Sequence, residues 1–246
     1  MRQFGLIGFP LSHSFSKRYF SDKFERETIS DAVYNNFEIP SISEFPAIVQ
    51  NTENLKGMNV TIPYKQEVMK YMDKLDKSAA FVGAVNVIKI DKDKKTTGYN
   101  SDYYGFMESL KRFLPDNRIN IKALILGTGG AAKAVEAALK TMNIEYKYVS
   151  RNGTGTILSY EQLTVSVLEE HELIINTSPI GMYPNIDACP NLNYEALNGS
   201  HYLFDLIYNP EITLFMQKGV SKGANVKNGL EMLHLQAEKA WEIWNE

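Results

Sequence analysis

Short apolar runs alternate along the chain with longer segments in which apolar residues recur every three or four positions. The short runs predict buried strands, and the longer segments predict helices with one apolar face. Strands that alternate with helices indicate an α/β fold with parallel-rich sheets. We expect strands at 3–9, 32–39, 57–61, 85–90, 96–99, 122–127, 145–150, 172–176, 202–207 and 224–226, and helices at 16–27, 42–51, 64–72, 77–82, 102–113, 131–141, 160–169, 211–221 and 229–244.

A glycine-rich turn, Gly127-Thr128-Gly129-Gly130, joins the strand expected at 122–127 to an alanine-rich helix. Glycines let the backbone approach an anion, and the helix N-terminus offers free N–H groups and the positive end of the dipole. The spacing is not the full dinucleotide fingerprint, because Ala132 stands where the third glycine would be. An ordinary strand-to-helix turn therefore stays open as an alternative. About 120 residues precede the turn, which is enough for a domain of their own.

The next expected strand ends in Ser150-Arg151-Asn152. In dinucleotide-binding folds the tip of this strand meets the adenosine ribose, where an acidic residue favours NAD and an arginine accommodates the 2′-phosphate of NADP. No Asp or Glu stands at this tip, and Arg151 does. A solvated charge at a strand end is the ordinary explanation for Arg151 alone. Beside the glycine turn, however, it favours NADP.

Polar side chains in the first half of the chain gather at the ends of expected elements. They occur after the first strand at 12–16, after another strand at 59–65, at Asn86 within an apolar run, and at 100–102. Each position alone is explained by a helix cap, a turn or a solvated side chain. Together they supply hydroxyl and amide groups, one ammonium and one carboxylate, which suits a polyol ligand.

The composition is that of an ordinary soluble globular protein, with 44% hydrophobic and 22% charged residues among 246. The net charge of −3 gives no basic footprint for nucleic acid. No apolar run approaches the roughly 20 residues of a membrane span, and the N-terminus leads straight into a strand, so we expect neither a membrane segment nor a signal peptide. The single cysteine, Cys189, suits a reducing compartment such as the cytoplasm. The four histidines are scattered without zinc-ligand spacing, so no metal is expected.

Taken together, the motifs resemble those of the shikimate dehydrogenase family, and the resemblance covers nearly the whole chain. Several motifs in family order are far more specific than any one alone. The segments that carry the resemblance are 8–16, 59–65, 83–86, 98–102, 127–132, 150–152, 176–182, 205–210 and 228–237.

The resemblance implies a reversible, NADP-linked reduction of 3-dehydroshikimate to shikimate, a step of chorismate and aromatic amino-acid biosynthesis. Lys65 and Asp102 would be the catalytic pair. Hydride transfer to a ketone leaves an alkoxide, so a positioned proton donor is needed, whereas a metal is not, because hydride transfer is the cofactor's own chemistry. The substrate would be bound by Ser14, Ser16, Thr61, Asn86, Tyr208 and Gln236, and the cofactor by Gly127, Gly129, Gly130, Ala131, Ser150, Arg151, Met182 and Gly229.

On the same resemblance we expect two domains with a cleft between them. Residues 1–101 plus 229–246 would bind substrate, and residues 102–228 would form a Rossmann-like NADP-binding domain. The choice between monomer and homodimer stays open.

The chain departs from the family pattern in ways that bear on the cofactor. Ser150 and Asn152 replace the usual Asn and Thr around Arg151, and no second basic residue follows in 153–155, so a weaker grip on the 2′-phosphate is expected. Lys17 stands where the family usually has proline, and Ser101 replaces a common threonine.

Two other functions remain possible from the sequence. A related quinate/shikimate dehydrogenase using NAD is one, although Arg151 without an acidic neighbour argues against NAD. A catalytically silent nucleotide-binding or regulatory module is the other, and it predicts loss of Lys65 or Asp102, both of which are present.

Overall fold

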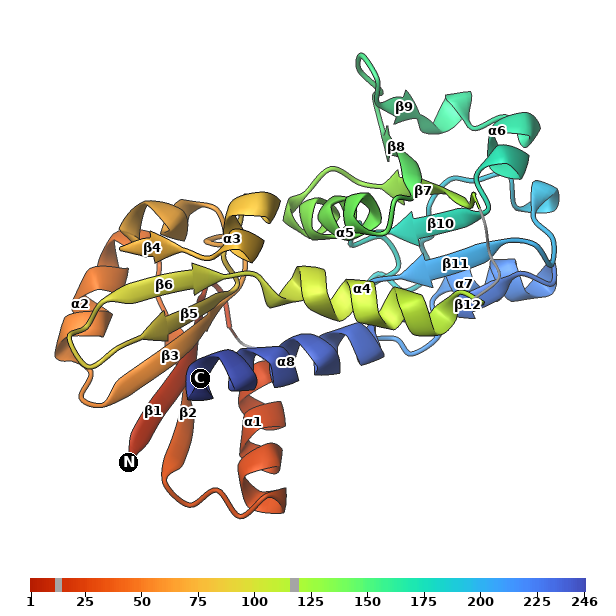
Figure 1. Cartoon of the computed structure of the whole chain (residues 1–246). Helices are drawn as coiled ribbons and strands as arrows, with labels where there is room; N and C mark the ends of the chain where they lie inside the picture. The colour runs from red at the N-terminus through yellow and green to blue at the C-terminus, as the bar shows by residue number, and fades with distance from the viewer. Residues whose placement is uncertain (12–14, 116–119) are drawn as a thin grey trace. The chain divides into compact units, whose positions relative to one another are not determined.

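The computed structural model describes residues 1–11, 15–115 and 120–246. Those residues divide into two compact units (Figure 1): the first unit is Met1–Ser101 with Ala237–Glu246, and the second unit is Asp102–Gln236. The boundaries drawn from the sequence differ at the tail, because they assign residues 229–236 to the first half of the protein. The contacts place these residues in the second unit, since Met232 packs in the same core cluster as Phe106 and Phe204.

The described residues of the first unit form a six-stranded mixed sheet in the order β2-β1-β3-β5-β6-β4. Strand β1 is parallel to both neighbours, whereas β5 runs antiparallel to β3 and β6. The hairpin expected around the charged segment 91–95 is confirmed as the β5–β6 pair. The strands are β1 (Arg2–Gly8), β2 (Ala32–Glu38), β3 (Leu55–Val60), β4 (Lys74–Leu75), β5 (Val87–Ile90) and β6 (Thr96–Tyr99).

Aromatic packing fixes the end of the last helix, α8 (Leu230–Asn245), in the first unit. The Phe4 and Trp244 rings stack with centroids 4.9 Å apart, and Trp244 Nε1 donates to Ile88 O at 3.0 Å. Gly57 has no side chain where the Trp244 indole lies, since a Cβ there would be 2.2 Å from the ring. The remaining helices of this unit are α1 (Phe15–Arg26), η1 (Ile42–Glu44), α2 (Phe45–Asn51), η2 (Glu67–Tyr71) and α3 (Lys77–Val82).

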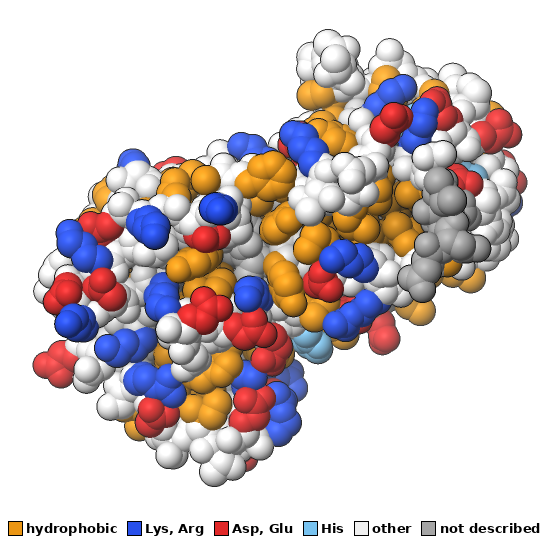
Figure 2. Space-filling model, viewed as in Figure 1, with side chains coloured by type: hydrophobic (Ala, Val, Ile, Leu, Met, Phe, Trp, Pro, Cys, Tyr) orange, Lys and Arg blue, Asp and Glu red, His pale blue; other side chains and the backbone are white. Residues whose placement is uncertain are grey.

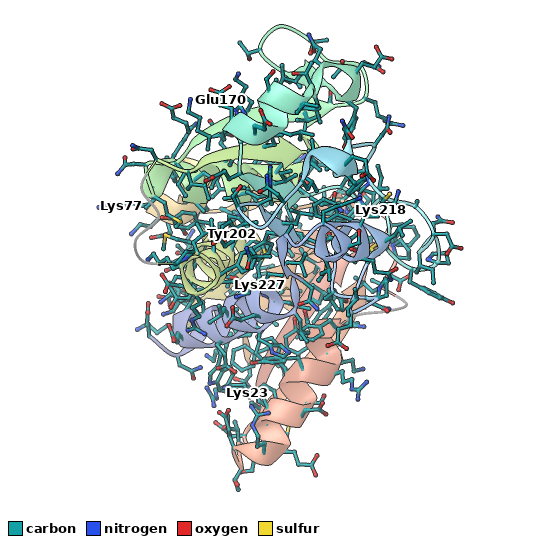
Figure 3. The ribbon with its side chains drawn as sticks, turned by 90° about the vertical axis from the view of Figure 1, so that its right-hand side faces the viewer. Lys23, Lys77, Glu170, Tyr202, Lys218 and Lys227 are labelled. Carbon is teal, nitrogen blue, oxygen red and sulfur yellow. The ribbon has the colours of Figure 1, made fainter. Side chains whose placement is uncertain are left out.

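A buried ammonium adds to this packing. Lys23 of α1, labelled in Figure 3, lies 2.8 Å from Glu27 Oε1 and 2.7 Å from Glu238 Oε2. Its pKa is raised by these two carboxylates against the opposing effect of burial. A paired buried cation is tolerated where an unpaired one would not be, so Lys23 ties α1 to the end of α8.

The described residues of the second unit form a six-stranded, all-parallel sheet in the order β12-β11-β10-β7-β8-β9. Counted from β7, this is the order 3-2-1-4-5-6 of the doubly wound dinucleotide-binding fold, in which ligands bind where the strand order reverses. That reversal lies between β7 and β10. The strands are β7 (Lys122–Leu126), β8 (Glu145–Ser150), β9 (Leu158–Ser159), β10 (Leu173–Asn176), β11 (Tyr202–Asp205) and β12 (Asn225–Lys227).

Alternate side chains of this sheet enter two cores. Ala123 and Ile125 of β7 pack with residues of α4 and α5, whereas Leu124 and Leu126 pack with residues of α6 and α7. This two-residue period is that of a strand buried on both faces. The helices are α4 (Ser101–Phe113), α5 (Gly130–Thr141), η3 (Tyr160–Gln162), α6 (Val165–Glu170), η4 (Tyr194–Ala196), α7 (Leu214–Ser221) and the first part of α8.

Several expected helices have different bounds in the structure. The helix expected at 42–51 is divided into η1 and α2, and the one expected at 64–72 is reduced to the 3-10 helix η2. The helix expected at 160–169 is divided into η3 and α6, because Thr164 adopts an extended conformation and caps α6 by accepting from Val167 N at 3.4 Å. The helix expected at 211–221 begins only at Leu214, where Thr213 caps it in the same way. Residues 151–157 connect β8 to β9 without a helix.

Salt bridges hold the start of α8 to the second unit. Lys227 Nζ, labelled in Figure 3, donates to Glu231 Oε2 at 2.5 Å and to Ser109 O at 3.0 Å. Glu231 also accepts from Ser109 Oγ at 2.8 Å and from Arg112 at 3.1 Å. These bonds connect β12, α4 and α8 and explain why the first turns of α8 belong to this unit.

The visible face of the molecule carries basic and acidic side chains intermixed, with no large patch of one sign among the described residues seen there (Figure 2). Within the described ranges, no helix has the length and apolar character to cross a membrane. The residues that the structure describes also contain no cluster of His, Cys, Asp or Glu suited to a metal ion.

Candidate active site

A pocket of about 430 Å³ in the second unit opens at the carboxyl ends of β7, β8 and β10. This is the edge of a doubly wound sheet at which ligands bind. Among the described residues that line it, Arg151 carries the only charged side chain. The lining residues are Gly127, Thr128, Val149, Ser150, Arg151, Asn152, Tyr160, Ser178, Pro179 and Ile180.

The glycines of the turn have two different reasons to be glycine. Gly127 has φ +115°, and a Cβ there would lie 2.8 Å from Thr177 Oγ1, so the protein's own backbone and packing require it. Nothing lies within 4 Å of a Cβ built on Gly129 or Gly130. The space above these two residues is therefore open to a ligand.

The N-terminus of α5 faces the same turn. Gly129 is its N-cap residue and supplies no side-chain cap hydrogen bond, and the following Gly130 and Ala131 are exposed. First-turn N–H groups without a side-chain cap are suited to binding a phosphate. The structure thus places Gly129, Gly130 and Ala131 where the sequence expects a pyrophosphate site.

The tip of β8 is held by a compact turn. Ser150 Oγ accepts from Gly153 N at 3.2 Å, and Thr154 and Ile157 exchange backbone hydrogen bonds of 3.0 and 2.9 Å. Arg151 is exposed and lines the pocket beside Ser150. The Ser150 side chain therefore shapes the turn that presents Arg151.

Tyr160 is a pocket residue that sequence reasoning missed. It follows β9, a strand of only two residues, so no hydrophobic pattern marks its position. Burial raises the pKa of the Tyr160 hydroxyl, and the Arg151 charge partly opposes this increase. The phenol therefore stays protonated near neutral pH and can donate a hydrogen bond beside Arg151.

Of the residues expected to bind the cofactor, Gly127, Ser150 and Arg151 line this pocket, and Gly129, Gly130 and Ala131 follow the glycine turn without lining it. Three further expected residues lie in loops that follow β10, β11 and β12. Met182 is 46% exposed, and Tyr208 is 38% exposed. Gly229 N donates to Ile207 O at 3.0 Å, and a Cβ on Gly229 would lie 2.1 Å from Leu206 O. Gly229 is therefore required by packing within the second unit.

A buried chain of hydrogen bonds surrounds Asn86, an expected substrate residue of the first unit. The Tyr34 hydroxyl donates to Asn59 Oδ1 at 2.7 Å. Asn59 Nδ2 donates to Asn86 O at 3.3 Å. Asn86 Oδ1 accepts from Ser101 N at 2.7 Å, and its Nδ2 donates to Ser101 Oγ at 3.1 Å. Asn86 is thus held through both its backbone and its side chain. Ser16 is half-buried at the start of α1.

Lys65 and Thr61 follow β3 in the same unit, and both are half-buried. Thr61 N donates to Ile7 O at 2.9 Å, and Val85 N donates to Lys65 O at 2.7 Å. The second bond anchors the Lys65 backbone to the residue before Asn86. Ser14 lies outside the described residues.

Asp102 and Gln236 both belong to the second unit, on the packed helices α4 and α8. A Cβ on Gly105 of α4 would lie 2.6 Å from Met232 O and 3.0 Å from Gln236 N, so α4 and α8 approach closely there. Gly105 is about one helical turn beyond Asp102. Asp102 itself occupies the first turn of α4, where a carboxylate is stabilised by the helix dipole.

Strand order, glycine turn and Arg151 define the second unit as a dinucleotide-binding domain, and the first unit adds an α/β domain with a buried polar network. Comparison with known proteins agrees with this class. Residues 6–88 match the shikimate dehydrogenase substrate binding domain. A shikimate dehydrogenase (NADP(+)) of Clostridium beijerinckii is 40% identical over 258 residues, covering 100% of this chain and 93% of that protein. The chain belongs to the shikimate dehydrogenase family.

Solved structures of the family share the fold. Shikimate 5-dehydrogenase from Thermus thermophilus, in complex with NADP(H) and shikimate, has a TM-score of 0.84 and 26% identity, covering 99% of this chain and 93% of that one. The enzyme from Listeria monocytogenes, in complex with shikimate and NAD, has a TM-score of 0.85 and 29% identity, covering 100% and 92%.

Proposed function

We propose that this protein catalyses the reversible, NADP-dependent reduction of 3-dehydroshikimate to shikimate. The observation that carries the proposal is the pocket of the second unit. Gly127 and Arg151 line it, with no acidic side chain among its described lining residues, and the open Gly129 and Gly130 at the start of α5 follow Gly127 directly in the chain. This arrangement suits a dinucleotide with a 2′-phosphate. The family membership supplies the substrate.

The described residues fit NADP in three places. Gly129, Gly130 and the start of α5 would hold the pyrophosphate, because their N–H groups and open space suit a close approach. Arg151 would hold the 2′-phosphate through charge-assisted hydrogen bonds. Met182 and Gly229 would lie toward the nicotinamide. When bound, the reduced cofactor supplies the hydride.

Lys65 and Asp102 would handle the proton. In the reduction, Lys65 donates a proton to the oxygen on which negative charge develops, and its ammonium also favours that charge. Asp102 would be the second member of the pair, as the family motifs imply. In the oxidation of shikimate, the same pair accepts the proton.

The substrate hydroxyl groups and carboxylate would be bound by the side chains that the family motifs mark. Ser16, Thr61 and Asn86 belong to the first unit, and Gln236 and Tyr208 belong to the second. The hydrogen bonds between the Asn86 amide and Ser101 support this role for Asn86, because they restrict the rotation of its side chain before substrate binds. We assign Ser14 to substrate binding from the family motif alone.

The direct test is a spectrophotometric assay at the nicotinamide absorbance, with shikimate or quinate as substrate and NADP or NAD as cofactor. We expect turnover to be highest with shikimate and NADP. Turnover with quinate and NAD but none with shikimate and NADP would refute the proposal, and absence of turnover in all four combinations would favour a silent module. The cytoplasmic location and the choice between monomer and homodimer stay predictions.

A further inference from the structure

A buried carboxyl group, Asp205, lies at the carboxyl end of β11 and takes no part in the proposed chemistry. Its side chain is 0% exposed. Among the described residues, Asn176 Nδ2 and Ile207 N donate to Oδ1 at 3.0 and 3.1 Å, and Thr213 Oγ1 donates to Oδ2 at 2.6 Å. Both carboxylate oxygens therefore accept hydrogen bonds, and Asp205 does not itself line the pocket.

Asn176 connects Asp205 to the pocket wall through further hydrogen bonds. Its Oδ1 accepts from Ser178 N at 3.1 Å and from Ser178 Oγ at 2.7 Å, and its Nδ2 also donates to Ile180 O at 3.3 Å. Ser178 and Ile180 line the pocket, with Pro179 between them. One amide group thus fixes the whole wall that residues 178–180 form.

The same wall is attached to the glycine turn. Thr177 N and Oγ1 both donate to Leu126 O, at 3.0 and 2.9 Å, directly before Gly127. A displacement of residues 177–180 would therefore alter both the wall and the turn on which the pyrophosphate is proposed to lie.

The chemistry of a carboxylate explains why Asp205 stands here. A carboxylate only accepts hydrogen bonds, so it requires Asn176 to present its NH₂ group, which leaves the amide oxygen for Ser178. An apolar residue at position 205 would leave the Asn176 amide held only by Ser178 and Ile180, the two residues that it positions. It would also leave Ile207 N and Thr213 Oγ1 without their acceptor in a buried place.

We propose that Asp205 is a positioning residue for the dinucleotide pocket, acting through the orientation of the Asn176 amide on residues 178–180. The inference rests on the proposed function, since it takes NADP as the ligand of this pocket. It adds a residue 29 positions from Asn176 that touches neither substrate nor cofactor.

Three variants and one control test the proposal. Asp205→Ala removes the acceptor, and Asn176→Ala removes the connection to Ser178 while leaving Asp205 two of its donors. Asp205→Asn is the conservative rescue, because its oxygen still accepts from Asn176 and Ile207 while its NH₂ group faces Thr213. His201→Gln is the matched control. His201 is also buried and hydrogen-bonded, but it precedes β11, at the opposite end of the strand from Asp205.

Two measurements are made on each full-length variant: NADP affinity by titration calorimetry, and amide hydrogen exchange of Ser178 and Ile180. We expect Asp205→Ala and Asn176→Ala to weaken NADP binding about tenfold and to speed exchange at both amides. Turnover at saturating NADP and the Michaelis constant for shikimate should change far less. Asp205→Asn and His201→Gln should bind NADP within about threefold of the wild type.

A purely structural role predicts a different pattern, in which both Asp205→Ala and His201→Gln lower the melting temperature and leave NADP affinity unchanged. That result overturns the proposal. If Asp205→Ala fails to fold, a wild-type NADP affinity and wild-type amide exchange in Asn176→Ala overturn the proposal. A wild-type protein that binds NADP but does not oxidise shikimate refutes only the proposed function. One that does not bind NADP overturns both.

Discussion

Replacing Arg151 with alanine tests the cofactor assignment most directly. Arg151 is the only charged side chain among the described residues that line the pocket, so no other described lining residue can replace its charge. A hydrogen bond to a charged group contributes about 1.5–3 kcal/mol. Because Arg151 is exposed, its bond to the 2′-phosphate is screened by solvent, and the lower end of this range applies. About 1.5 kcal/mol corresponds to roughly a tenfold weaker binding of NADP.

The assay compares the Michaelis constants and dissociation constants of NADP and NAD for wild type and variant. NAD has no 2′-phosphate, so its constants should change by less than about twofold. The preference for NADP should also decrease as salt is added, because salt weakens exposed ion pairs. Exposed charges more than about 10 Å apart are largely screened at 0.1 M salt.

Lys147→Ala provides the matched control. Lys147 lies on the same strand, β8, is exposed, and does not line the pocket. The Lys147→Ala substitution removes the same charge as Arg151→Ala without removing a proposed contact with the cofactor. An equal loss for NADP and NAD in Arg151→Ala, or an equal loss in both variants, would refute the argument that Arg151 recognises the 2′-phosphate.

The remaining predictions concern catalysis, packing and pH. Lys65→Ala should lower turnover about 10²–10⁴-fold with little change in shikimate binding, and Asp102→Asn should also lower it; near-normal turnover in a folded Lys65 variant would contradict the assignment. Gly57→Ala should lower the free energy of unfolding by about 1–3 kcal/mol in urea titrations, because its Cβ would overlap the indole of α8, while turnover of the folded fraction is unchanged. Gly130→Ala should weaken NADP binding measured by calorimetry without lowering the melting temperature. Burial raises the pKa of Asp205 from 3.8 to about 6, so its stabilising contribution is complete below 3.8 and is lost as the pH rises through 6. The free energy of unfolding of the wild type should therefore fall by up to about 3 kcal/mol relative to that of Asp205→Asn between pH 4 and pH 7. Urea titrations of both proteins at the two pH values measure this difference, and a difference that does not change with pH would contradict the prediction.

The sequence predicts the local parts of this structure well, for a physical reason. The β5–β6 hairpin, the strand before Gly127 and the position of Arg151 depend on residues close together in the chain, where periodicity and turn chemistry carry the information. The family motifs add the residues that should meet. The division of α8 between the two units has no such signal, because apolar periodicity shows that a helix is buried but not which core each turn enters.

Pairs that are distant in the chain are harder to predict. Asn176 and Asp205 both end strands that the sequence predicts, yet their mutual hydrogen bond follows from the adjacency of β10 and β11, which is a property of the folded sheet. Tyr160 reaches the pocket from a two-residue strand that is too short to show a pattern. In each case the residue type was visible, and the missing information was the strand order.

The glycines show how the structure separates residues that a motif treats as equal. The family motif assigns Gly127, Gly129, Gly130 and Gly229 alike to the cofactor site. Side chains at Gly127 and Gly229 would overlap the protein's own atoms, at 2.8 and 2.1 Å, so packing alone accounts for glycine at both. Gly129 and Gly130 meet no described atom within 4 Å. Glycine is favoured over alanine at the N-cap, which is Gly129, whereas at Gly130, inside the helix, alanine is the better helix former. Packing therefore gives no reason for glycine at these two positions. A bound ligand that needs the space does, which makes the open pair stronger evidence for the pyrophosphate site than the crowded pair.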